Sequence, residues 1–307
     1  MKASWIIVSY NTKDVTLDCL KSLQDHETTI DQEVIVVDND SKDGSPDAIA
    51  EKHPWVHLIR SGGNLGFAKG SNLGMAASTG DLVILLNPDT VVHPGALRHL
   101  VEFLRENESV GIVGGRLLSS EGKTQWSQRY FPSITRLLSE TLYLHYLLPR
   151  LRWTGELDKN PDHYDRVSYP DWVSGAFLGI RREIYEEIGG LDERYFMYYE
   201  DVDWCFECRK RGWEIAFIPE ARVTHYGGLS SSQDMGTFYP RLIQSQIQFN
   251  RKHFSVFKCA ILRAIICLST LQRTIVLALT FPFRKRRNKR ARDLLISRWK
   301  GFKVAIG

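Results

Sequence analysis

The sequence predicts an α/β fold, with a Rossmann-like, mostly parallel sheet that carries helices on both faces. Short continuous apolar runs alternate with helical patterns over the first third of the 307 residues, which is typical of strands buried in such a sheet. Polar motifs follow these runs directly, at the carboxyl ends of strands where such sheets bind ligands. The composition, 43% hydrophobic and 25% charged, suits one large domain with an appendage.

Four runs are expected as strands, and helical patterns lie between them. The strands are Trp5–Val8, Val34–Val37, His57–Arg60 and Leu82–Leu86. One helix carries Val15, Cys19, Leu20 and Leu23 on one face, and two others run from Phe67 to Ser78 and from Gly95 to Arg105.

The regular alternation weakens after Arg116. Residues 150–170 are rich in Pro, Asp, Asn and Arg, and we expect an exposed loop there, a lid that a ligand would order. Three later elements are expected: a helix from Glu200 to Arg211, a strand over Trp213–Ile218 and a helix over Tyr239–His253.

Charge and cysteine content exclude some classes of protein. A net charge of +4 is too small for a nucleic-acid binder, so we expect no such partner. Five cysteines without regular spacing argue against a disulfide framework and for a reducing compartment. Cys205 and Cys208 form one isolated C-x-x-C, which favours two small buried side chains over a zinc site. The first apolar run is too short for a signal peptide.

The segment Phe196–Trp204 sets three carboxylates, Glu200, Asp201 and Asp203, among aromatic residues. Desolvation in such a setting raises the pKa of a carboxylate and makes it a better proton acceptor. The alternative is an ordinary helix start, where the helix dipole favours acidic residues.

Two other motifs are candidates for binding an anionic ligand. Asp89 follows the strand Leu82–Leu86, and a carboxylate there suits a divalent cation that bridges diphosphate oxygens, although Asn87-Pro88-Asp89 is also a common turn. His225 follows another apolar run and is either a structural histidine or, paired with Asp89, a ligand that completes a metal site and favours Mn²⁺ over Mg²⁺. The glycine-rich segment Ser61–Asn72 enters a helix, whose amides can approach a phosphate or sugar, or it is only a tight turn.

The ordered set of motifs resembles the family 2 glycosyltransferases of the GT-A fold. Within that family it is most similar to the rhamnosyltransferase-like members that build bacterial surface polysaccharides, over roughly residues 3–255. The motifs are Ser9-Tyr10-Asn11, Asp38-Asn39-Asp40-Ser41, Gly63–Ala68, Asn87-Pro88-Asp89, Gly175-Ala176-Phe177 and Tyr199–Asp203.

The resemblance implies a nucleotide-diphosphate sugar donor, a divalent cation (Mn²⁺ or Mg²⁺) and inversion at the anomeric carbon. On the donor side it places Tyr10 and Asn11 against the nucleotide, Asp38 at the base or ribose, and Asn64 and Gly66 near the nucleotide. It assigns the cation to Asp89 and His225. Asn87 stands where the family's first metal-site acid would be, which leaves one charge fewer for the cation.

On the acceptor side the resemblance assigns Trp172, Gly175 and Ala176, and it makes Asp201 the general base. An inverting transfer needs that base opposite the departing diphosphate, so one carboxylate cannot serve both ends. Glu200 and Asp203 are rival bases. Glu200 would otherwise orient the acceptor or pair with an arginine, while a helix turns Asp203 away from Asp201.

The last fifty residues are expected as a membrane-association segment over 256–307, after a transferase domain over 1–255. Val256–Phe283 is apolar but interrupted by charged residues, and an arginine near a bilayer centre costs about 2.5–3.5 kcal/mol. With the basic block Arg284–Arg292 it favours an interfacial helix pair on an anionic leaflet. The alternative is a helix packed on the enzyme, with a solvated tail after it.

Together these features predict a metal-dependent transferase, peripheral on the cytoplasmic face of the cell membrane. Rhamnose from dTDP-rhamnose is the expected donor, and a lipid-linked glycan or oligosaccharide is the expected acceptor. The alternatives are a UDP- or GDP-sugar donor, a nucleotidyltransferase on a similar sheet, or a non-catalytic module that binds a nucleotide sugar or glycan.

Overall fold

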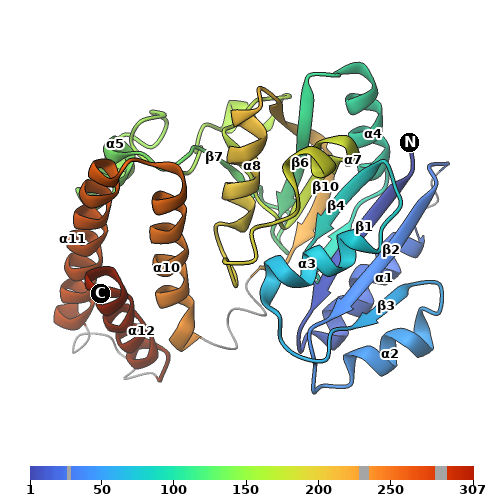
Figure 1. The fold of residues 1–307 in the computed structure, drawn as a ribbon, viewed down its shortest axis with the longest axis horizontal. Coiled ribbons are helices and arrows are strands. Elements are labelled where there is room, and N and C mark those ends of the chain that lie inside the picture. The colour runs from blue at the N-terminus through green and yellow to red at the C-terminus, as the bar shows by residue number, and fades with distance from the viewer. Residues whose placement is uncertain (26–28, 228–234, 281–288) are drawn as a thin grey trace. The chain divides into compact units, whose positions relative to one another are not determined.

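The computed structural model describes the whole chain except residues 26–28, 228–234 and 281–288, and it divides into two compact units (Figure 1). The sheet unit holds residues 1–131, 157–196 and 200–230. The helical unit holds residues 132–156, 197–199 and 231–307.

The sheet unit is built on one eight-stranded sheet within the described residues, in the order β3-β2-β1-β4-β9-β6-β10-β5. Its first four strands run parallel, as do β6 and β10, whereas β9 pairs antiparallel with both β4 and β6. The strands are β1 (Ala3–Ser9), β2 (Gln32–Asp38), β3 (His57–Arg60), β4 (Leu82–Leu86), β5 (Thr90–Val92), β6 (Val110–Leu118), β9 (Phe177–Arg181) and β10 (Glu214–His225). A separate ribbon joins β7 (Gln128–Arg129) to β8 (Trp172–Val173).

Helices cover both faces of this sheet, which confirms the predicted fold class. Trp5 and Ile7 of β1 pack in one core with apolar residues of α1 and α4. On the opposite face, Gly74 of α3 lies so close to Ile6 that a Cβ atom there would come within 2.7 Å of it. The helices are α1 (Lys13–Asp25), α2 (Ser45–Lys52), α3 (Gly66–Ala76), α4 (Ala96–Glu106), α7 (Arg182–Ile188) and α8 (Glu200–Lys210).

The segment expected as an exposed loop, residues 150–170, is exposed at Arg150–Trp153 and over much of residues 161–169, but some of its residues are buried in the protein. The Tyr164 side chain is buried at the end of a 3₁₀ turn (Pro161–Tyr164), and its hydroxyl accepts a hydrogen bond from the Gln128 amide at 2.8 Å. Asp158 is buried as well and accepts from the Tyr130 hydroxyl at 2.7 Å. Polar composition was misleading here because these polar groups find partners inside the protein.

The helical unit has its own apolar core, formed by residues of α5, α10, α11 and α12. Its helices are α5 (Ile134–Thr141), α6 (Leu144–Leu147), α10 (Met235–His253), α11 (Val256–Thr280) and α12 (Lys289–Ile306). The boundary expected at residue 255 therefore differs from the division into compact units, because Tyr239, Ile243 and Ile247 of α10 pack with the C-terminal helices.

Helix α11 is long and apolar enough to cross a membrane, judged by length and composition alone. Part of it is buried within the helical unit, where the Arg263 Nε atom donates to the Ala305 carbonyl oxygen of α12 at 2.8 Å. The alternative of a solvated tail is wrong for residues 289–306, because they form helix α12. Residues 284–287 of the expected basic block lie outside the described residues.

Cys205 and Cys208 are both buried on α8, as the isolated C-x-x-C predicts. Burial raises the pKa of the Cys208 thiol to about 12. Within the described residues, no three His, Cys, Asp or Glu side chains are grouped as a metal site would require.

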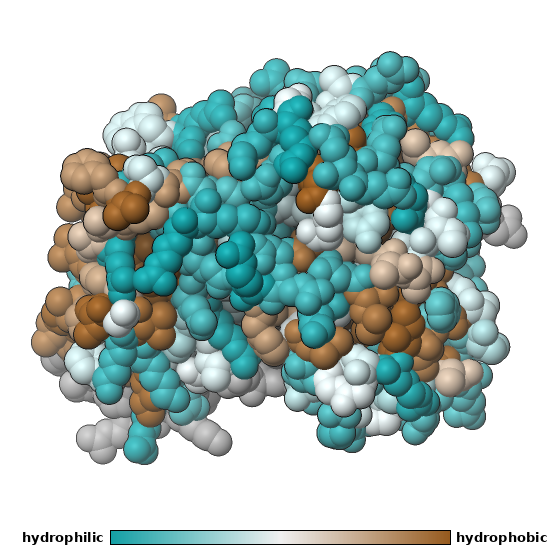
Figure 2. All heavy atoms as spheres, viewed as in Figure 1, coloured by the Kyte–Doolittle hydropathy of each residue, from teal (hydrophilic) through white to brown (hydrophobic). Residues whose placement is uncertain are grey.

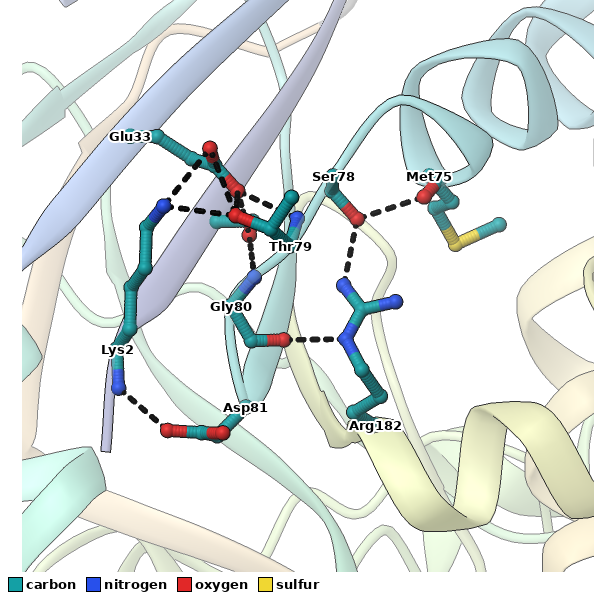
Figure 3. Close-up of polar contacts among 9 residues, drawn as sticks. Lys2, Glu33, Met75, Ser78, Thr79, Gly80, Asp81 and Arg182 are labelled. Carbon is teal, nitrogen blue, oxygen red and sulfur yellow. Dashed lines mark hydrogen bonds and ion pairs between the residues drawn. The ribbon is translucent and has the colours of Figure 1, made fainter.

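A polar network joins the amino ends of β1 and β2 to the loop before β4 (Figure 3). Glu33 accepts hydrogen bonds from the Ser4 hydroxyl and the Thr79 amide, both at 2.6 Å, and from the Lys2 ammonium at 3.1 Å. Arg182 extends the network by donating to the Ser78 hydroxyl at 2.7 Å. Burial alone would raise the pKa of Glu33, but these hydrogen bonds lower it to about 2.

We expect Glu33→Gln to lower the free energy of unfolding by about 1–3 kcal/mol at neutral pH. The glutamine side chain is uncharged, and its NH₂ group is a donor that cannot accept from the donors around Glu33, such as the Lys2 ammonium. The folded carboxylate has a pKa of about 2 against 4.5 for the free group, so its contribution is complete above pH 4.5 and is lost towards pH 2. Urea unfolding between pH 2 and 7 measures this. The exposed Glu51 provides the control Glu51→Gln, and equal losses in both variants would contradict the prediction.

Candidate active site

The loops after β1 and β2 lie together, because these strands pair in register with Ser9 opposite Asp38. The Asn11 amide donates to the Ser41 hydroxyl at 2.9 Å, and the Asn11 side-chain oxygen accepts from the Lys42 amide at 2.7 Å. Asn11 has a φ of 51°, a left-handed conformation that asparagine tolerates better than most residues. Tyr10 is held in the same short loop, directly after β1.

Asp38 is the last residue of β2, and one of its carboxylate oxygens is buried without a hydrogen-bond partner among the described residues. Its Oδ2 atom accepts from the Ser41 amide at 3.1 Å, while Oδ1 is buried and has no hydrogen-bond partner among the described residues. The same holds for the Oδ1 atom of Asn39. Buried acceptors are normally paired, so two unpaired oxygens at one strand end indicate a place where a ligand supplies the donors.

The glycine-rich loop is fixed to the segment that leads into the acidic motif. The Asn64 side-chain oxygen accepts from the Gly66 amide at 3.1 Å, and the Phe67 amide donates to the Phe196 carbonyl at 2.8 Å. Gly66 has a φ of 80°, and a Cβ atom on it would lie 2.4 Å from the Phe196 oxygen. The structure therefore explains Asn64 and Gly66 through local geometry and packing.

Asp89, His225 and Asn87 come together at the carboxyl end of β4, as the sequence predicts for the first two. The His225 Nε2 atom lies 3.4 Å from the Asp89 carboxylate and 3.2 Å from the Asn87 side-chain nitrogen. Gln125 contacts the same histidine twice: its nitrogen donates to the His225 carbonyl at 2.6 Å, and its oxygen faces Nδ1 at 3.0 Å.

These two contacts fix how the imidazole is used. Because the Gln125 oxygen can only accept, Nδ1 carries the proton, and the Nε2 lone pair can accept from the Asn87 side-chain nitrogen at 3.2 Å. A metal-binding histidine is typically held in this way, with its other nitrogen donating to an oxygen. A carboxylate and an imidazole are ligands that Mn²⁺ accepts, but within the described residues no third His, Cys, Asp or Glu side chain joins Asp89 and His225.

Asp201 lies at the first turn of α8 and is held by backbone amides. Its Oδ2 atom accepts from the Gly175 amide at 2.9 Å, and its Oδ1 atom accepts from the Val202 amide at 2.8 Å. Burial raises the pKa of Asp201, whereas these amides and the positive charge of Arg129 act in the opposite direction. The result is a carboxylate of raised basicity in a fixed orientation.

The rival acids have different environments. Glu200 is buried, and its Oε2 atom has no partner among the described residues. Burial and the neighbouring charge of Asp201 raise the pKa of Glu200 well above its usual range. Asp203 instead accepts from the Tyr195 hydroxyl at 3.2 Å inside the sheet unit, on another side of the helix.

Gly175 and Ala176 connect Asp201 to the segment that carries Asn87 and Asp89. While the Gly175 amide binds Asp201, the Ala176 carbonyl accepts from the Asn87 amide at 3.1 Å. Trp172, three residues before Gly175 in the chain, is buried. The centre of its ring lies 5.1 Å from the Arg129 guanidinium carbon, and its Nε1 atom donates to the Tyr130 carbonyl. Arg129 and Gln125 are site residues that sequence reasoning missed, since neither belongs to a recognisable motif.

The three residues before α8 leave the sheet unit and pack in the helical unit. Tyr198 and Tyr199 have φ values of 71° and 70°, which are unusual for bulky residues and cost about 1 kcal/mol or more each. The Ser245 hydroxyl donates to the Met197 carbonyl at 3.0 Å, and the Tyr199 ring lies 5.6 Å from that of Phe249. Packing against α10 therefore maintains a strained turn directly before Glu200 and Asp201.

The sequence model of Glycosyl transferase family 2 matches residues 4–189. The chain belongs to this family. An N-acetylglucosaminyl-diphospho-decaprenol L-rhamnosyltransferase of Mycobacterium tuberculosis is 34% identical over 213 residues, 66% of this chain and 68% of the relative. The rhamnosyltransferase WbbL of Escherichia coli K12 is 25% identical, over 72% of this chain and 82% of its own length.

Solved structures share the fold of this family 2 glycosyltransferase. A mannosyltransferase of Pyrobaculum calidifontis, solved with GDP-Man and Mn²⁺, gives a TM-score of 0.57 at 17% identity and covers 99% of this chain and 86% of its own. GalNAc-T7, solved with UDP, GalNAc and Mn²⁺, gives 0.56 at 16% identity over 73% of this chain and 43% of its own.

Two glycines in the glycine-rich loop allow a matched test of whether Gly66 is required because it packs against Phe196. Gly62 and Gly66 both have positive φ, 73° and 80°, but nothing lies within 4 Å of a Cβ atom on Gly62. We expect Gly62→Ala to cost about 1 kcal/mol from backbone strain alone, and Gly66→Ala about 2–4 kcal/mol because its Cβ meets Phe196. Urea unfolding compares them, and equal losses would contradict the assignment of Gly66 to packing.

Proposed function

We propose that this glycosyltransferase transfers a sugar with inversion from a nucleotide-diphosphate donor, best matched by dTDP-rhamnose, to a lipid-linked or oligosaccharide acceptor. One observation carries the proposal: the carboxyl edge of the sheet holds the Asp89–His225 group and Asp201 on separate elements, joined through Gly175 and Ala176. The names of both rhamnosyltransferase relatives support rhamnose as the transferred sugar, and the name of the mycobacterial relative supports a decaprenyl-diphosphate-linked acceptor.

In this proposal Asp201 is the general base. Its carboxylate accepts the proton of an acceptor hydroxyl while the oxygen attacks the anomeric carbon and the bond to the diphosphate breaks. The Gly175 and Val202 amides hold the carboxylate in place, and its raised pKa increases its affinity for the proton. Glu200, with an unpartnered buried oxygen, is assigned to orient the acceptor.

At the donor end, Asp89 and His225 would hold a divalent cation, with Asn87 in place of a second acid. Such a cation stabilises the negative charge of the departing diphosphate. Tyr10, Asn11 and Asp38 are assigned to the nucleotide, since the unpaired Asp38 oxygen, beside the loop of Tyr10 and Asn11, offers an acceptor to the base or ribose. Gln125 orients His225.

A nucleotidyltransferase is disfavoured, because Ser9-Tyr10-Asn11-Thr12 stands where that class needs a glycine-rich, basic loop. A non-catalytic binding module has no need for a carboxylate held as Asp201 is. Turnover assays over dTDP-, UDP- and GDP-sugars, each with and without Mn²⁺, separate these possibilities. Nucleoside diphosphate release that needs both donor and acceptor supports the proposal.

We also propose that the enzyme is peripheral on the cytoplasmic face of the membrane, where a lipid-linked acceptor is accessible. The segment 256–307, with the basic residues around 284–292, would lie on an anionic leaflet. Each basic residue near such a surface contributes about 1 kcal/mol.

Asp201→Asn keeps the shape of the side chain and removes its basicity. We expect kcat to fall by about 10²–10⁴-fold, with donor affinity little changed. In the unmutated enzyme, kcat/KM should rise with pH through the raised pKa of Asp201, and the variant should lose this acid limb. Steady-state kinetics against pH measure both. Asp203→Asn is the control, and near-normal turnover by Asp201→Asn would transfer the role to Glu200.

Asp89→Ala should abolish the Mn²⁺ dependence of nucleoside diphosphate binding, and His225→Ala should weaken it. Gln125→Ala should lower the apparent Mn²⁺ affinity by about 10–100-fold, because the imidazole would lose its orienting partner. Calorimetric titration with and without Mn²⁺ measures these effects, with Gln244→Ala on the exposed face of α10 as the matched control. Binding by the unmutated protein that ignores Mn²⁺ would contradict the assignment.

A further inference from the structure

The segment Leu142–Trp153 after α5, which contains the short helix α6 and is called the 142–153 loop below, exposes large apolar side chains to solvent. Leu147 is 76% exposed, Tyr146 is 68% exposed and Leu142 is 57% exposed. Leu148, Leu151 and Trp153 are exposed as well. Soluble proteins rarely present such a concentration of apolar surface unless it binds something.

Hydrogen bonds at its base keep this 142–153 loop in shape. The Ser139 hydroxyl donates to the Thr154 carbonyl at 2.8 Å, and the Glu140 carboxylate accepts from the Glu156 amide at 2.8 Å. The Thr154 hydroxyl also donates to the Leu148 carbonyl at 2.8 Å. The apolar side chains are therefore presented by a closed and ordered loop.

The composition of the 142–153 loop indicates which partner it fits. Residues 141–155 contain no acidic residue but include Arg150 and Arg152 beside the leucines. Tyr143, Tyr146 and Trp153 combine an apolar ring with a polar atom, the combination enriched at membrane–water boundaries. Apolar side chains flanked by arginines match a bilayer with anionic headgroups.

Further apolar surface lies in the same unit. Helix α5 packs against α11, whose first residues Val256 and Phe257 are 88% and 77% exposed. In the space-filling view, hydrophobic side chains gather on the left, over α11 and the α5 region (Figure 2).

We propose that the 142–153 loop is a membrane-docking element. Leu142, Tyr146 and Leu147 would enter the acyl boundary, and Arg150 and Arg152 would contact anionic headgroups. This contact is separate from the C-terminal segment and rests on the membrane location proposed above. It would bring the enzyme to the surface that carries a lipid-linked acceptor.

Vesicle co-sedimentation of the full chain tests the docking element. Leu147→Ser should weaken binding by about tenfold, both to phosphatidylcholine vesicles and to equal mixtures with phosphatidylglycerol. Leu73→Ser, at a partly exposed leucine of α3 in the sheet unit, is the matched control and should leave binding unchanged. Changing Arg150 and Arg152 to Gln should weaken binding only to the anionic vesicles and only at low salt.

Tryptophan quenching by brominated phosphatidylcholine gives a direct readout. Trp153→Phe should remove part of the quenching that the unmutated protein shows, whereas Trp55→Phe, at an exposed tryptophan of the sheet unit, should remove none. All variants should keep the unfolding midpoint and the turnover of a short soluble acceptor.

Unchanged vesicle binding by Leu147→Ser would overturn the proposal, and a change in oligomeric state instead would make the loop a protein interface. Absence of vesicle binding by the unmutated protein would overturn it as well. Turnover of the soluble acceptor is measured separately, so failure of membrane docking is distinguishable from failure of the proposed transferase reaction.

Discussion

The site depends on one short connection, the Gly175–Ala176 dipeptide that precedes β9. The Gly175 backbone amide binds the carboxylate of Asp201, and the Ala176 carbonyl accepts from the backbone amide of Asn87. The same two residues therefore hold both Asp201 and the segment that carries Asp89. A Cβ atom on Gly175 would lie 3.4 Å from that of Asp201, so the two residues are in van der Waals contact. In the proposed reaction the base and the donor-binding group must keep a fixed separation, and backbone hydrogen bonds provide that more rigidly than side chains alone.

The two ends of the sheet have different roles. At the amino ends, Glu33 and Arg182 bind their polar neighbours and hold the strands together. At the carboxyl ends, Asp38, Asn39 and Glu200 retain buried oxygens without partners among the described residues. A protein tolerates such unpaired groups only where the rest of the fold supplies enough stability.

Those parts of the fold and of the candidate site that one local sequence pattern determines could be predicted from the sequence. The strands β1 to β4 were predicted from apolar runs, and the meeting of Asp89 with His225 from their positions after strands. Strand β9 was not, since its five residues carry no periodicity that separates a strand from a buried helix. Gln125 and Arg129 act through partners about 70 to 100 residues away, and a single sequence holds no signal for such pairs. The packing of α10 with the C-terminal helices was missed for the same reason.

The antiparallel insertion of β9 has a consequence for synthesis on the ribosome. Until β9 emerges, β4 is an outer strand whose sequence, Leu-Val-Ile-Leu-Leu, has neither a charge nor a proline to discourage pairing with another chain. Its partner residues are distant, since Leu86 pairs with Phe177. At a translation rate of about 5–20 residues per second, β4 remains an edge strand for on the order of 5–20 s before β9 is synthesised. The nascent chain is therefore most vulnerable to aggregation during that interval, when a chaperone has most to protect.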